Sequence, residues 1–164
     1  MKKGLILAIG LCLVVVCVAL LWQNSWASEL SRRLGVDLFQ GTLVEEEDTH
    51  GGFHGDGERR VVLSFAGGDL SPRLEKAAGW QPFPLPEELS TALYGRTWEG
   101  GREGPCIGFP MPPVTRGFFW FQDRHSQAAD SADPSQLYER WSYNFTVAVY
   151  DEDTQRLYYI EVDT

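Results

Sequence analysis

Cysteine is scarce in this chain, and its placement excludes a fold stapled by disulfides. Two of the three cysteines, Cys12 and Cys17, lie in an apolar N-terminal run, and only Cys106 lies outside it. The rest of the chain therefore cannot form an intramolecular disulfide, and it is long enough to bury a core without one. Because exported domains often carry disulfides, this pattern favours a compartment where they are little used. Cys106 is expected to be a small buried or free thiol.

Positive charge is also in short supply. The chain has 14 lysine and arginine residues against 23 aspartate and glutamate residues, which gives a formal net charge of -9. An acidic surface repels nucleic acid and anionic lipid headgroups, so we expect no nucleic-acid partner. Such a surface can attract cations or basic partners, although the simpler interpretation is that it keeps the domain soluble.

The common catalytic templates are absent as well. The sequence contains no serine nucleophile elbow, no phosphate-binding glycine loop and no Cys-x-x-Cys pair. The usual hydrolase and redox mechanisms therefore find no support in it. We expect a protein that binds or scaffolds rather than one that catalyses a reaction.

What the chain does have is an apolar run from Gly4 to Trp22, which follows Lys2 and Lys3 and contains no charged side chain. About 20 apolar residues in a helix cross the ~30 Å hydrocarbon core of a bilayer, so the run is just long enough. The two lysines favour an orientation with the N-terminus inside. The sequence thus predicts a membrane anchor over residues 1–27 and an extracytoplasmic domain over residues 28–164.

Two alternatives to a retained anchor stay open. Ser25-Trp26-Ala27 roughly fits a signal-peptidase site, and cleavage near Ala27 would release the domain as a secreted protein. The run can also be interpreted as a buried core helix of a soluble domain.

The remaining residues predict one α+β domain. Helices are expected at Ser28–Gly35, at Ser71–Ala78 and from Pro86 to a stop at Gly95, where capping residues, proline and glycine stand at the ends. Alternating apolar and β-branched residues predict strands at 38–46, 59–65, 117–122, 143–150 and 157–162. The prolines after Trp80 predict an extended connector, and residues 96–115 an irregular loop. About five strands in hairpins and two or three short helices indicate a mainly antiparallel sheet with one face covered by helices.

The best candidate site is the glycine-rich loop from Asp48 to Gly57. His50 and His54 lie four residues apart, and Asp48 and Asp56 flank them at a spacing of two. Imidazole and carboxylate are ligands for zinc and similar divalent ions, and His125 would add a third imidazole if the end of its strand lay beside the loop. The alternative is a loop whose threonine, aspartate and histidine side chains bond its own backbone.

The stretches Asp48–Gly57 and Tyr143–Thr164 resemble small single-span or secreted proteins of Gram-positive bacteria, uncharacterised proteins that carry no named activity. This resemblance implies a bacterial envelope setting, and it implies no cofactor or site. We therefore expect a membrane-anchored extracytoplasmic domain whose partner is an envelope protein or a cell-wall component. The alternative is a divalent-metal-dependent enzyme with its site in the Asp48–Gly57 loop. The many aromatic residues are expected in the core first, although they could also line a sugar or peptide groove.

Overall fold

The computed structural model describes residues 10–14, 26–51 and 55–164. The chain divides into two compact units, Met1–Gly41 and Thr42–Thr164. The predicted membrane segment, residues 4–22, lies mostly outside the described residues. Within the described ranges, no helix combines the length and the apolar composition needed to cross a membrane.

In the first unit, residues 26–34 are helical and the helix ends at Gly35, which confirms the short helix predicted there. Leu30 and Leu34 are buried one turn apart. A tight turn follows, in which the Asp37 carboxylate accepts the Phe39 amide at 3.0 Å and the Leu38 carbonyl accepts the Gly41 amide at 2.9 Å. Because these bonds hold residues 37–41 in a turn, the strand predicted from Leu38 begins only at Thr42.

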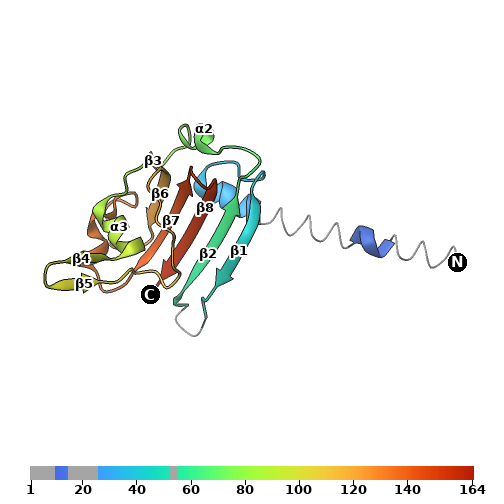
Figure 1. Cartoon of the computed structure of the whole chain (residues 1–164). Coiled ribbons are helices and arrows are strands. Elements are labelled where there is room, and N and C mark those ends of the chain that lie inside the picture. Colours follow the sequence, from blue (N-terminus) through green and yellow to red (C-terminus); the bar gives the residue numbers. More distant parts are fainter. Residues whose placement is uncertain (1–9, 15–25, 52–54) are drawn as a thin grey trace. The chain divides into compact units, whose positions relative to one another are not determined.

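The second unit is built on a six-stranded antiparallel sheet with the order β1-β2-β8-β7-β6-β3 (Figure 1). The C-terminal strand β8 lies between β2 and β7. It therefore joins the pair β1–β2 to the strands β7, β6 and β3 in one sheet. The strands of this sheet are β1 Thr42–Asp48, β2 Gly57–Ser64, β3 Trp80–Pro82, β6 Gly117–Asp123, β7 Asn144–Asp151 and β8 Arg156–Asp163.

The predicted α+β class and mainly antiparallel sheet are confirmed, with six strands in place of about five. The additional strand is β3, which pairs with β6 where an extended connector was predicted. β3 is an edge strand, and an edge tolerates the missing amide of Pro82 because one side of the strand needs no partner.

A second correction concerns residues 96–115, which were predicted as an irregular loop. They begin with a two-stranded hairpin, β4 Arg96–Trp98 and β5 Gly101–Glu103. Each strand has three residues, which is too short for an alternating pattern to stand out in the sequence.

The helices of this unit are α2 Ser71–Leu74, α3 Glu87–Tyr94 and the 3-10 helix η1 Pro134–Glu139. The prediction for α3, with its stop at Gly95, is confirmed. The prediction for α2 was too long, because Lys76 and Ala77 bond the carbonyls three residues back and turn the chain out of the α-helix. Both α3 and η1 supply side chains to the core on one face of the sheet, as predicted.

That core is formed by apolar side chains of four strands packed against α3, η1 and the segment after β5. Its buried members are Val62, Leu89, Ala92, Leu93, Ile107, Val114, Phe119, Phe121, Leu137, Phe145, Val147, Val149, Tyr158, Ile160 and Val162. Side chains alternate along a strand, so the neighbouring residues point to the opposite face. Those on β2, β7 and β8 that are also buried include Val61, Leu63, Ala148, Leu157 and Tyr159.

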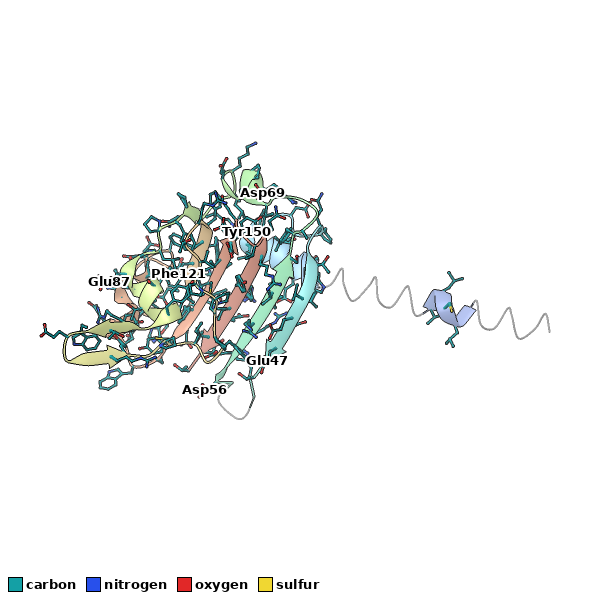
Figure 2. All side chains as sticks on the ribbon, viewed as in Figure 1. Glu47, Asp56, Asp69, Glu87, Phe121 and Tyr150 are labelled. Atoms are coloured by element: carbon teal, nitrogen blue, oxygen red, sulfur yellow. The ribbon has the colours of Figure 1, made fainter. Side chains whose placement is uncertain are left out.

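Tyr150 ties the segment before α2 to the sheet (Figure 2). Its hydroxyl donates to Asp69 at 3.0 Å and accepts the Leu70 amide at 3.1 Å. The Asp69 carboxylate also accepts the amide and the hydroxyl of Ser71, the first residue of α2. Burial raises the pKa of Tyr150 to about 12, which keeps the hydroxyl a donor at ordinary pH.

Candidate functional site

The predicted site lies at the end of the sheet where β1 leaves it and β2 enters. Thr49 joins the two strands by accepting the Glu58 amide at 2.9 Å. Gly57 allows the close approach, because a Cβ there would lie 2.5 Å from the Cα of His50 and its φ is +158°. His50 therefore packs directly against β2, which brings its ring within reach of Asp163, the residue paired with Gly57 on β8.

Two carboxylates hold the His50 ring. Its Nδ1 lies 2.7 Å from Asp48 Oδ1 and its Nε2 lies 3.1 Å from Asp163 Oδ2. The same Asp48 oxygen accepts the His50 amide at 2.9 Å. Partial burial acts to lower the pKa of His50, but the hydrogen bonds and charges of Asp48 and Asp163 outweigh it and raise that pKa above its usual value. The arrangement favours an imidazolium bridging two carboxylates.

Arg124 adds a third group to the cluster, and it comes from the end of β6. It follows β6 directly and reaches across β7, donating to both carboxylate oxygens of Asp163 at 2.9 and 3.0 Å. It also donates to the hydroxyl of Thr146 at 2.9 Å and to the carbonyls of Phe145 and Val162. Asp163 is thus shared by His50 and Arg124, and the cluster links the ends of β1, β8, β7 and β6.

The pH dependence of this cluster has a definite sign. A histidine whose pKa is raised on folding stabilises the protein fully below its unfolded pKa, about 6.5, and that contribution is lost as the pH rises through the folded pKa. We expect the difference in unfolding free energy between the wild type and His50→Gln to be larger at about pH 5 than at about pH 8.5. Urea unfolding of the full chain in detergent measures it. A difference that stays the same at both pH values would contradict the assignment.

A groove of about 500 Å³ lies beside the cluster. It is lined by Thr49, Asp56, Gly57, Glu58, Gly108, Phe109, Asp163 and Thr164. Both carboxylate oxygens of Glu58 lie 2.8 Å from the Gly108 amide, and the Arg60 guanidinium lies over the Phe109 ring at 4.9 Å. These contacts fix the segment after β5 against β2 and form one wall of the groove.

The structure brings together only part of the predicted metal set. Asp48 and His50 are in contact, whereas Asp56 is exposed and lines the groove. His125 bonds within its own loop, through its amide to Asp123 and through its ring to the Gln127 amide. His54 lies outside the described residues. Sequence reasoning missed Asp163, because its contact with His50 spans 113 residues.

Among the described residues, no group of three or more histidine, cysteine, aspartate and glutamate side chains is placed to hold a metal ion. What they do show is the alternative of a loop that bonds itself, in which Thr49 and Asp48 satisfy nearby amides. Cys106 is half-buried, and its sulfur lies 3.6 Å from the Tyr138 hydroxyl.

A second, separate cleft of about 260 Å³ lies between α3 and η1. It is lined by Glu87, Glu88, Thr91, Arg96, Ser135, Tyr138 and Glu139. Figure 2 shows Glu87 well apart from Asp56, which places this cleft away from the groove at the end of β2. Arg96 joins α3 to the β4–β5 hairpin by bonding Glu87 at 3.0 Å and Glu103 at 3.3 Å.

Two exposed tryptophans belong to the same segments as residues that line this cleft. Trp98 of β4 is 50% exposed, and its ring lies 5.3 Å from the guanidinium of Arg96. Trp141 is fully exposed and follows Glu139 by two residues. The helix η1 ends at Glu139, and Trp141 lies beyond it in solvent.

The chain matches no protein-family model, no curated protein and no solved structure.

Proposed function

We propose that this chain is a membrane-anchored extracytoplasmic protein that binds or scaffolds a partner in the bacterial cell envelope. The apolar run from Gly4 to Trp22 and the two lysines before it support the location. The single observation that supports binding is the pair of exposed tryptophans: Trp98 contacts Arg96, which lines a polar cleft, and Trp141 follows by two residues Glu139, which lines it too. Tryptophan is enriched among the residues that dominate binding energy in protein interfaces, and a fully exposed tryptophan offers such an anchor to a partner.

The location is tested by fractionating a Gram-positive host that expresses the full chain. We expect the protein in the membrane fraction after an alkaline wash, with the domain digested by protease added outside the cells. A variant with Leu11, Leu13 and Val14 replaced by aspartate should fail to reach the membrane, because charge at the centre of a span is costly. A mature N-terminus at Ser28 in mass spectrometry would show instead that the protein is secreted.

Binding is tested in the same cells with a photo-crosslinking residue at position 141. We expect a discrete cross-linked band from position 141 and none from position 44, an exposed site on β1 at the far edge of the sheet (Figure 1). Peptide mapping of the band identifies the partner segment. Equal cross-linking from both positions would contradict a specific surface at the cleft.

The alternative, a divalent-metal-dependent enzyme at residues 48–57, has less support. Both ring nitrogens of His50 already face carboxylate oxygens, and a protonated imidazole cannot act as a metal ligand. Zinc-dependent stabilisation that disappears in His50→Gln, measured in the same urea series, would favour the alternative.

A further inference from the structure

We propose that the cleft between α3 and η1, together with Trp98 and Trp141, docks a basic segment of a protein partner, an inference that rests on the binding function proposed above. The ligand class follows from two properties of this surface. One is its excess of negative charge, and the other is the presence of exposed indole rings on a rigid frame.

The charge of the cleft selects cations. Three carboxylates, those of Glu87, Glu88 and Glu139, line it with one guanidinium, that of Arg96. Arg96 already bonds Glu87 and, outside the cleft lining, Glu103. Among the described residues, Glu88 and Glu139 form no ion pair, so they are available to arginine or lysine side chains of a partner. The net charge of -9 adds a long-range field of the same sign, which steers basic partners toward the domain.

Trp98 is already a platform for a guanidinium. The ring of Trp98 crosses its own hairpin above Gly101, where a Cβ would lie 2.6 Å from the indole. The missing side chain at position 101 therefore lets the ring lie flat on the paired strand. Arg96 sits 5.3 Å from this ring in cation–π contact, while half of the side chain stays exposed. The exposed part remains accessible to the apolar stem of a partner's arginine or lysine side chain.

Trp141 projects from a fixed point of backbone. The preceding residue, Arg140, is buried and donates two hydrogen bonds to the buried carboxylate of Asp123. Two residues span at most ~7 Å, so Trp141 stays close to Glu139 at the cleft. The anchor at Arg140 pre-orders the loop, which reduces the entropy that a partner loses on binding.

Other occupants fit less well. Anionic lipid headgroups would meet carboxylates of the same sign. A neutral glycan could stack on the tryptophans, but it would leave the excess charge of Glu88 and Glu139 without a counterpart. A basic peptide satisfies both the indole rings and the carboxylates.

The test uses the full chain in detergent micelles and a fluorescein-labelled peptide of alternating arginine and glycine. We expect a saturable rise in fluorescence anisotropy that weakens as salt increases from low to physiological levels. Trp98→Ala and Trp141→Ala should each weaken binding about tenfold, and Glu88→Gln several-fold. Because these side chains are exposed or at the cleft rim, the melting temperature of each variant should stay near that of the wild type.

Two matched variants serve as controls. Glu75→Gln removes an exposed carboxylate after α2, and Val44→Ala shortens an exposed apolar side chain on β1, and neither should change binding. A peptide of alternating glutamate and glycine should not bind. Absence of binding by the arginine peptide, equal binding by the tryptophan variants, or tryptophan-dependent binding of a chitin oligosaccharide in its place would overturn the proposal. A cross-link from position 141 to a segment without basic residues would overturn it too, while leaving the binding function intact.

Discussion

Replacing Arg140 by methionine is expected to lower the free energy of unfolding by about 3–5 kcal/mol. The Arg140 side chain is 8% exposed and that of its partner Asp123 only 1%. Arg140 donates to both carboxylate oxygens of Asp123, which also accepts the His125 amide. Removing the guanidinium leaves a buried carboxylate without its counter-charge, and this costs more than the pair contributes when it is intact.

The decrease in the free energy of unfolding caused by Arg140→Met should also depend on pH. Burial acts to raise the pKa of Asp123, but the hydrogen bonds and charge of Arg140 outweigh it and hold that pKa below the ordinary value of 3.8. The stabilisation is therefore complete above pH 3.8 and is lost as the pH falls through the lowered folded pKa. The free energy of unfolding of the wild type should exceed that of Arg140→Met by the largest amount at neutral pH. This difference should become smaller in acid.

Urea unfolding of the full chain provides the measurement. Arg156→Met serves as the control, because Arg156 is exposed on β8 and should change stability by no more than about 0.5 kcal/mol. The double variant Asp123→Asn, Arg140→Met should recover part of the loss, since it removes the buried charge along with its partner. A loss below about 1 kcal/mol for Arg140→Met would show that Asp123 relaxes into solvent.

Replacing Gly117 by alanine is expected to cost about 3 kcal/mol or more. Gly117 begins β6 with a φ of +147°, a conformation that strains any residue with a Cβ. An added Cβ would also overlap the carbonyl oxygen of Tyr150 on the paired strand β7, and backbone atoms in a sheet cannot rotate aside. Strain and overlap therefore act together where the start of β6 pairs with the end of β7.

The matched control is Gly104→Ala. Gly104 is exposed, and a Cβ there would meet open space. We expect its free energy of unfolding to stay within about 0.5 kcal/mol of the wild-type value. If Gly117→Ala unfolded at the same midpoint as Gly104→Ala, the close approach between β6 and β7 would be wrong.

Much of the sheet was predictable because its signals are local. The β7–β8 hairpin is predicted by alternating apolar residues on both sides of a polar turn, and every pairing in it stays within one short stretch of chain. The helix α3 is predicted in the same way, since its proline, its acidic first turn and its terminal glycine all lie within a few residues.

The edge elements were missed for physical reasons that are equally specific. β3 contains Pro82, which sequence rules count against a strand, yet its pairing with β6 uses only one of its edges. β4 and β5 are held by three pairings and by Arg96, which bonds across the hairpin to Glu103 and away from it to Glu87. None of these contacts leaves a periodic trace in the sequence.

The candidate sites also combine local features, which the sequence shows, with contacts between distant residues, which it does not. The sequence by itself indicated local bonding in the Asp48–Gly57 loop as one of two alternatives, because an aspartate can accept the amide two residues later, as Asp48 does from His50. It also determined the apolar run at residues 4–22 and the acidic charge of the rest. Only the tertiary structure decided that Asp163 lies between His50 and Arg124, and that one acidic cleft is lined both by Arg96, which contacts Trp98, and by Glu139. Those arrangements depend on which strands pair and which loops pack together. The free energy of such packing comes from contacts between residues far apart in the chain, which a local sequence pattern does not show.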